Sequence, residues 1–242
     1  MTIIKLYRVD APHPQAQACA ACSVRGRSLF GALDKPGLDY IHSFIANIEL
    51  EPGKPLYEAG AHGHALFTVR EGIVRFERVT ERGDRRIVRL AGRGDLVGQE
   101  VLLRRPYADD AVACTAVQLC RIPAHLVDGL SAQNPALVRE LMTRWQRALE
   151  DSEVWLADLA TGPARRRLLR LLRKLAEHAD AGGPIWMPRR DEIGAMLNVT
   201  FETASRLVSG LRRDGVLRLE GPRHARLDAA ALQRALREED AR

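Results

Sequence analysis

The spacing of apolar residues divides the chain into a β-rich part and a helical part. Between Ile48 and Pro123 the apolar stretches are short, and glycines fall between them at intervals suited to tight turns. Because no helical pattern separates these stretches, we expect an antiparallel β-roll of the jelly-roll or barrel kind. The strands that the pattern predicts are Leu66–Val69, Ile73–Phe76, Ile87–Leu90 and Val112–Ile122.

The region before the β-rich part has a different pattern. Residues 1–32 contain prolines and glycines that interrupt any period, and they are expected to be irregular. Leu38, Ile41 and Phe44 then recur at helical spacing, which predicts a short helix over Leu33–Asn47.

A long amphipathic helix is expected after the β-rich part. Asn134 is a good N-cap and Pro135 suits the first helical position, while Thr161-Gly162-Pro163 is typical of a helix end. The steps between its apolar positions alternate between four and three, and only one serine interrupts them. Such a repeat is typical of a helix that packs against a partner helix along one seam, so we expect a homodimer. The alternative is that this helix packs against its own domain. The expected dimer interface is Val138, Met142, Trp145, Leu149, Ser152, Leu156 and Leu159.

The strongest functional pattern is a helix-turn-helix. The sequence predicts a helix over Arg190–Leu197, a tight turn at Asn198, and a second helix over Phe201–Arg213 that Thr200 caps. The flanking predictions are a helix over Ala164–Ala179, a hairpin or wing over Val216–Leu227, and a closing helix over Ala229–Glu238.

Three polar side chains share one face near the start of the second helix, where a recognition helix contacts base edges: Glu202, Ser205 and Arg206. Arg206 is suited to O6 and N7 of guanine, and Glu202 to the N4 amino group of cytosine. The residues expected at phosphates are Thr200, Arg190, Arg212 and Arg213. The alternative is a solvated surface on a structural helix pair.

The distribution of charge supports the DNA-binding interpretation. The formal net charge is +6, and residues 163–226 alone contain 14 Lys and Arg against 7 Asp and Glu. The positive excess is therefore confined to the segment that contains the helix-turn-helix. A basic module on a near-neutral body indicates a phosphate-binding partner.

Other classes of protein receive little support. The 242 residues contain no apolar run of membrane-spanning length and no N-terminal export signal, and four cysteines do not indicate a secreted disulfide scaffold. We therefore expect a cytoplasmic protein without a membrane partner. No catalytic triad, phosphate loop or zinc-protease motif occurs, so an enzyme is not expected. A β-roll sensor or adaptor that does not bind DNA is the main rival class.

The chain as a whole resembles the CRP/FNR family of bacterial transcription regulators. The resemblance rests on Pro52-Gly53 to Gly60, Gly94-Asp95-Leu96-Val97-Gly98, the long helix and the winged helix-turn-helix. It implies an α+β chain with a Cys-containing segment (1–32), a cyclic-nucleotide-binding-like β-roll (33–133), a dimerisation helix (134–161) and a winged helix-turn-helix domain (162–242). Glu202, Ser205 and Arg206 match the FNR branch, which implies TTGAT-like inverted repeats, activation as the usual outcome and RNA polymerase as a partner.

The resemblance also bears on what the β-roll senses. The cyclic-nucleotide branch binds its ligand phosphate with an Arg-Ser pair, and here the corresponding segment is Asp109-Asp110. Two carboxylates repel a phosphate, so no response to cAMP is expected.

The FNR branch holds an oxygen-labile [4Fe-4S] cluster on four cysteines. Cys19, Cys22 and Cys120 match three of these positions, whereas the remaining position falls at Ser28, a poor ligand for iron. Cys114 lies six residues from Cys120 on an expected strand, too far for one cluster without a bend. The fourth ligand stays open, with His13, Asp34 or an external group as candidates. The alternatives are haem, ligated by His13, His62, His64 or a cysteine; thiol chemistry at Cys19 and Cys22; or a cofactor-free dimer.

Overall fold

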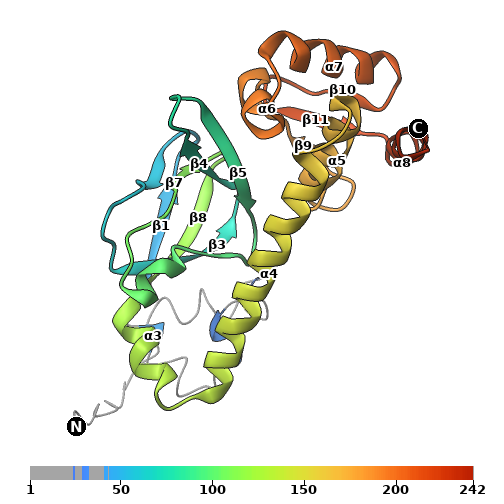
Figure 1. Ribbon diagram of the computed structural model, residues 1–242. Coiled ribbons are helices and arrows are strands. Elements are labelled where there is room, and N and C mark those ends of the chain that lie inside the picture. Colours follow the sequence, from blue (N-terminus) through green and yellow to red (C-terminus); the bar gives the residue numbers. More distant parts are fainter. Residues whose placement is uncertain (1–23, 25–28, 33–40, 43, 242) are drawn as a thin grey trace. The chain divides into compact units, whose positions relative to one another are not determined.

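The computed structural model describes Val24 and residues 29–32, 41–42 and 44–241 of the 242 residues (Figure 1). These residues form two compact units. The first comprises the described residues of Met1–Arg75 and Ala91–Ala148, and the second comprises Phe76–Leu90 and Leu149–Arg242. The fold is α+β, as the sequence predicts, with a β-roll followed by helices and a helix-turn-helix.

The β-roll consists of two four-stranded sheets with the orders β1-β8-β3-β6 and β2-β7-β4-β5. Leu66 and Val69 of β3 pair with Ile122 and Leu119 of β8, and all four side chains are buried. The strands are β1 (Ala46–Leu50), β2 (Pro55–Tyr57), β3 (Ala65–Glu71), β4 (Val74–Val79), β5 (Arg85–Ala91), β6 (Leu96–Val97), β7 (Asp110–Ala113) and β8 (Val117–Pro123), with the 3₁₀ helices η2 (Leu29–Ala32) and η3 (Gln99–Leu103).

Two expectations about this region are wrong. The end of the expected helix over Leu33–Asn47 belongs to β1, which pairs with β8 so that Asn47 lies opposite Cys120; residues 33–40 of that prediction lie outside the described part. The expected strand over Val112–Ile122 is two strands in different sheets, because the chain leaves β7 after Ala113 and enters β8 at Val117. Cys114 and Cys120 are therefore not on one straight strand.

Helix α3 (Ala124–Ser131), which the sequence pattern did not predict, leads to the long helix α4 (Pro135–Leu159). Asn134 caps α4 as predicted, since its Oδ1 accepts hydrogen bonds from the backbone N–H groups of Ala136 and Leu137 at 3.1 and 3.2 Å. On its inner side Arg144 is buried and donates to the carbonyl oxygen of Gly94 at 2.9 Å. No helix of the described residues is long and apolar enough to span a membrane.

The second unit carries the winged helix-turn-helix. A three-stranded sheet in the order β10-β11-β9 lies with four helices around a core to which α5 contributes five buried leucines (Figure 1). The elements are α5 (Ala164–Ala176), β9 (Ile185–Trp186), α6 (Arg190–Leu197), α7 (Phe201–Arg213), β10 (Leu217–Leu219), β11 (His224–Leu227) and α8 (Ala229–Asp240). The hairpin β10–β11 is the predicted wing, and the sequence pattern did not predict β9.

Candidate nucleic-acid interface

The turn between α6 and α7 is set by two residues. Asn198 ends α6 in the left-handed conformation with φ of 53°, which asparagine tolerates better than most residues. The backbone N–H of Val199 then donates to the carbonyl oxygen of Gly194 at 3.3 Å. Thr200 caps α7, because its Oγ1 accepts from the N–H of Thr203 at 3.2 Å. The helix-turn-helix predicted from the sequence is therefore present, with α6 and α7 at the predicted bounds.

A buried carboxylate joins the first helix of this motif to the wing. Glu192 of α6 is 1% exposed and accepts from Nη1 and Nη2 of Arg223 at 2.7 and 3.2 Å. It also accepts from the backbone N–H of Arg189 at 2.6 Å, which satisfies a free donor at the start of α6. A bidentate pair of this kind is directional, so Glu192 and Arg223 fix the turn of the wing, between β10 and β11, relative to α6.

The three expected base-contact residues lie along one side of α7. Glu202 and Arg206 are exposed, and Ser205 is partly exposed. Hydrogen bonds from the backbone N–H of Glu202 and from the Thr200 side chain lower the pKa of the Glu202 carboxyl, and the charge of Arg206 adds to this effect. Glu202 therefore stays ionised, as an acceptor for a base amino group must.

The basic side chains of the DNA-binding domain differ in whether a carboxylate of the chain binds them. Nine form ion pairs, namely Arg165, Arg166, Arg170, Arg173, Lys174, Arg189, Arg218, Arg223 and Arg226. Arg167, Arg234 and Arg237 form none with the described residues. The four arginines predicted to contact DNA form no ion pair with the described part of the chain: Arg190, Arg206, Arg212 and Arg213. Their charge is available to an external anion, whereas that of the first group is largely neutralised.

Two of these free cations are close enough to affect each other. Burial lowers the pKa of the Arg190 guanidinium, and the positive charge of Arg212 lowers it further. Like charges held together without an acid between them favour the binding of an anion, and a DNA phosphate carries the required charge.

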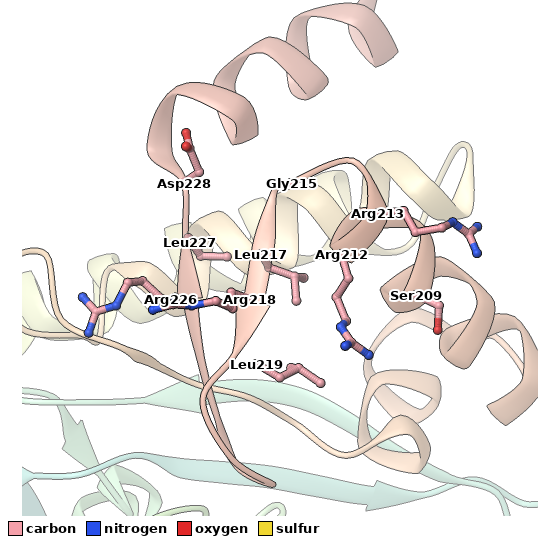
Figure 2. Close-up of a pocket in the computed structure, with 10 residues that line it drawn as sticks. All are labelled: Ser209, Arg212, Arg213, Gly215, Leu217, Arg218, Leu219, Arg226, Leu227 and Asp228. Atoms are coloured by element: carbon pink, nitrogen blue, oxygen red, sulfur yellow. The ribbon is translucent and has the colours of Figure 1, made fainter.

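A hollow of about 720 Å³ lies between the end of α7 and the wing (Figure 2). In Figure 2 the Arg212 side chain extends toward β10, over Leu217 and Leu219, whereas Arg213 points away from that strand. The hollow is lined by Ser209, Arg212, Arg213, Gly215, Leu217, Arg218, Leu219, Arg226, Leu227 and Asp228.

The sequence pattern did not predict Ser209, Arg218 or Arg226 as lining residues of this hollow. Ser209 lies one helical turn after Ser205 on the same side of α7, a signal that the helical period contained. Arg218 and Arg226 belong to the wing, and both bind Glu220: Nη2 of Arg218 and Nε of Arg226 donate to its Oε1 at 2.8 and 2.9 Å. The hydrogen bonds, chiefly that from Arg226, hold the pKa of the Glu220 carboxyl below its usual range.

The side chains of the expected dimer seam lie mostly on the exposed side of α4. Met142 and Leu156 are 61% and 65% exposed, and Val138, Trp145, Leu149 and Ser152 are also exposed. Leu159 is the exception, since it is 1% exposed. It is therefore packed within its own chain and is not part of the exposed row.

Most of the residues expected to hold a cofactor lie outside the described part of the chain. These are Cys19, Cys22, Ser28, His13 and Asp34. Cys120 is partly exposed on β8, with its Sγ 4.0 Å from Oδ1 of Asn47. Cys114 is buried, and Nη1 of Arg75 lies 4.0 Å from its Sγ. Within the described residues no three His, Cys, Asp or Glu side chains gather as metal ligands do. Cys114 and Cys120 therefore do not form a metal site with the other described residues alone.

The aspartates expected to repel a cyclic nucleotide are at the start of β7. Asp110 is partly buried and accepts from the backbone N–H of Ala59 at 2.7 Å, and Asp109 precedes it. Nearby, the rings of Tyr57 and Tyr107 stack with centroids 3.8 Å apart, and the hydroxyl of Tyr107 donates to the carbonyl of Ala65. The absence of a cAMP response stays a prediction from the sequence.

Comparisons with known proteins identify both parts of the chain. The cyclic nucleotide-binding domain family matches residues 47–134, and the Crp-like helix-turn-helix domain family matches residues 166–235. The fumarate and nitrate reduction regulatory protein of Vibrio cholerae is 27% identical over 211 residues, covering 84% of each chain. The chain belongs to the CRP/FNR family of transcription regulators.

Further similarities agree with this assignment. A protein of Rhizobium leguminosarum named "Probable transcriptional activator" is 28% identical over 212 residues, which is 86% of this chain and 88% of that protein. The structure of FixK2 from Bradyrhizobium japonicum matches with a TM-score of 0.71 and 21% identity, covering 79% of this chain and 96% of that one. At this identity the second match supports the fold alone. The CRP/FNR protein described here is a regulator with a helix-turn-helix DNA-binding domain, not an enzyme.

Proposed function

We propose that this CRP/FNR regulator binds TTGAT-like inverted repeats as a homodimer, with one α7 in the major groove of each half-site. Glu202, Ser205 and Arg206 contact base edges, and Thr200, Arg190, Arg212 and Arg213 contact phosphates. The observation that supports this most directly is that none of the four arginines expected at DNA forms an ion pair with a carboxylate among the described residues.

The exposed row on α4 supports the dimer. Val138, Met142, Trp145, Leu149 and Leu156 place large apolar side chains in solvent, and their spacing of three and four residues is interrupted only at Ser152. Two copies of such a row bury each other along a two-fold axis, which matches the symmetry of an inverted repeat. Half-site centres are then about one helical turn apart.

The test is the affinity for an inverted repeat compared with a shuffled duplex of equal composition. Arg206→Lys keeps the charge and loses the planar pair of donors, so it should lower affinity for the repeat by about tenfold or more and leave the shuffled duplex unchanged. Arg212→Gln should weaken both duplexes and reduce the salt dependence by about one phosphate contact per subunit. Equal affinity of the unaltered protein for both duplexes would contradict sequence-specific binding, and no binding to either would favour the adaptor class.

We further propose that the regulator responds to a redox or gas signal through Cys19 and Cys22, with Cys120 as a third ligand if a [4Fe-4S] cluster is the sensor. The support is the Cys-x-x-Cys spacing and the FNR-type relatives. Absorption spectra of protein purified without oxygen should show a broad sulfur-to-iron band that bleaches in air. A sharp Soret band would indicate haem instead, and a colourless protein would leave thiol chemistry or a cofactor-free regulator.

A further inference from the structure

Three ion pairs join the end of α4 to α5, the first helix of the DNA-binding domain. Oδ1 and Oδ2 of Asp158 accept from Nη1 of Arg170 at 2.9 Å and from Nη2 of Arg173 at 3.1 Å. About two helical turns earlier in α4, Oδ1 of Asp151 accepts from Nζ of Lys174 at 3.1 Å. All five residues belong to the second unit. We call these five side chains the α4–α5 clasp.

The clasp restrains two helices that the chain itself connects loosely. Only residues 160–163 join α4 to α5, and Gly162 among them has φ of 85°. Because glycine allows wide backbone freedom, this turn alone does not determine the angle between the helices. Trp155 and Leu159 of α4 are buried, but apolar packing is non-directional, whereas hydrogen bonds between charged groups are directional.

The other side of α5 is fixed within the DNA-binding domain. Five leucines of α5 are buried, and the helix packs against α6, α7 and α8. Arg170 also donates from Nη2 to Oδ1 of Asp240 in α8 at 2.9 Å. A restraint between α4 and α5 therefore also orients α7 relative to the end of α4.

We propose that Asp151 and Asp158 are positioning residues that set the half-site spacing which the dimer accepts. In the proposed dimer α4 carries the exposed apolar row, and hence the two-fold axis, so the clasp fixes the separation of the two α7 helices. One added base pair moves a half-site by about 3.4 Å and turns it by about 35° around the DNA axis. The inference rests on the proposed function and names the residues that determine its spacing.

A dimer binds a repeat of the wrong spacing only if the clasp of one subunit opens. An ion pair at a partly exposed site changes an equilibrium constant by about fivefold at most. The three pairs of one subunit together should therefore discriminate between spacings by about 10-fold to 100-fold. The side chains of Asp151 and Arg173 are 56% and 54% exposed, so added salt should weaken this discrimination.

The test compares inverted repeats that have identical half-sites and spacers shortened or lengthened by one or two base pairs. The unaltered protein should bind one spacer best, with a Kd about 10-fold or more lower than for its neighbours. All repeats offer the same half-site phosphates and bases, so the ratio of two Kd values separates the cost of spacing from the general salt effect on DNA binding. This ratio should fall as salt is added.

Asp158→Asn assigns the discrimination to the clasp. It removes the charge that binds Arg170 and Arg173, so the ratio between neighbouring spacers should fall by about fivefold or more. Affinity for a duplex with a single half-site should not change, because α7 is unaltered. Asp180→Asn is the matched control: Asp180 is exposed, forms no ion pair with the described residues, and should leave the ratio as it is.

An exchange of charges tests the second part of the clasp. Lys174→Glu places two acids together and should lower the ratio, whereas Lys174→Glu combined with Asp151→Lys restores an ion pair of opposite direction and should recover it. Failure of the combined variant to recover the ratio would refute the role of Asp151.

The two proposals fail in different ways. If the unaltered protein prefers the repeat over the shuffled duplex but binds all spacers equally, or if Asp158→Asn keeps the full ratio, the role of the clasp is refuted and the proposed function stands. The same holds if Asp158→Asn weakens the single half-site and every repeat by one common factor, because the clasp then only stabilises the domain. If the repeat is not preferred at all, the proposed function is refuted, and the role of the clasp falls with it.

Discussion

Gly194 lies close to the backbone of the turn in the helix-turn-helix. A Cβ atom at this position would lie 2.7 Å from the carbonyl oxygen of Val199, which is shorter than van der Waals contact. The obstacle is backbone, held in place by the turn at Asn198 and by the cap of α7 at Thr200. The turn therefore requires a residue without a side chain on this side of α6.

Gly194→Ala should destabilise the DNA-binding domain. Either α6 or the backbone at Val199 must move to relieve the contact, and overpacking of this kind costs about 1–3 kcal/mol. Thermal unfolding followed by circular dichroism would measure the loss, and affinity for the inverted repeat should fall as well because α7 is displaced.

Gly210→Ala is the matched control. Gly210 is within α7, and a Cβ added there meets nothing within 4 Å. The same substitution should therefore stabilise the helix by up to about 1 kcal/mol, since alanine loses less conformational entropy in a helix than glycine. Destabilisation by both substitutions would show that the contact with Val199 is not the cause.

Residues on a regular helix face were easier to predict than residues paired across elements. Glu202, Ser205 and Arg206 follow from the helical period alone, and the structure places them on one side of α7. The ion pair between buried Glu192 and partly exposed Arg223 joins positions 31 residues apart, and no periodic pattern reports such a contact. The burial of Leu159 within its own chain also depends on tertiary packing, which the seam pattern does not report.

At the scale of elements, the wing has its own electrostatic balance. Glu220 lies in the hairpin between β10 and β11 and binds Arg218 and Arg226, which line the hollow beside α7. A DNA phosphate at this hollow must compete with a carboxylate that is already in place. The wing therefore contributes less positive charge than its sequence indicates.

Glu220→Gln should free the two wing arginines and strengthen DNA binding. We expect higher affinity for both the inverted repeat and the shuffled duplex, with a steeper decrease as salt is added, because each new phosphate contact adds about 0.9 to the slope of log K against log salt. Fluorescence anisotropy across a salt series would measure both quantities.

A second variant separates this effect from the general change in net charge. Glu238→Gln removes the same charge from an exposed position of α8 outside the wing. It should change the affinity only slightly. An equal gain from both variants would mean that the ion pairs of Glu220 do not restrain Arg218 and Arg226.

Elements with clear end signals were predicted best. α6 and α7 have the predicted bounds, because Asn198 and Thr200 mark their ends locally. The helix expected over Leu33–Asn47 was wrong at its end because short apolar stretches suit either structure, and pairing with β8 decides for β1. The break between β7 and β8 was missed for the same reason.

At the scale of the whole molecule, DNA binding is easier to predict from the sequence than the signal to which the protein responds. DNA binding uses a motif with fixed spacing and a fixed charge pattern, so the sequence alone predicted it. The signal depends on a small number of side chains brought together by the fold, and a Cys-x-x-Cys pair is compatible with iron, zinc or thiol chemistry. Ser28 at the expected ligand position makes the family pattern insufficient to choose among them.

Dimerisation links the signal to DNA binding in the proposed function. Ser152 interrupts the exposed row on α4 without a charge, and a buried hydroxyl costs less than a buried carboxylate. The dimer should therefore depend little on a loaded cofactor. Sedimentation of the cofactor-free protein at micromolar concentration should show a dimer, and a monomer would contradict this expectation.

Leu149→Glu should separate that dimer. Across a two-fold axis each substitution occurs twice, so the interface loses two leucines, each of which contributes about 1.5–3 kcal/mol, and gains two like charges. The dimer Kd should rise by about 100-fold or more.

Thr143→Glu adds the same charge at an exposed position beside the row and should leave the dimer intact. Affinity for a duplex with a single half-site should be the same for both variants, because α7 is unaltered. If Leu149→Glu weakens the single half-site as strongly as the inverted repeat, the row on α4 stabilises the fold of one chain rather than the pairing of two.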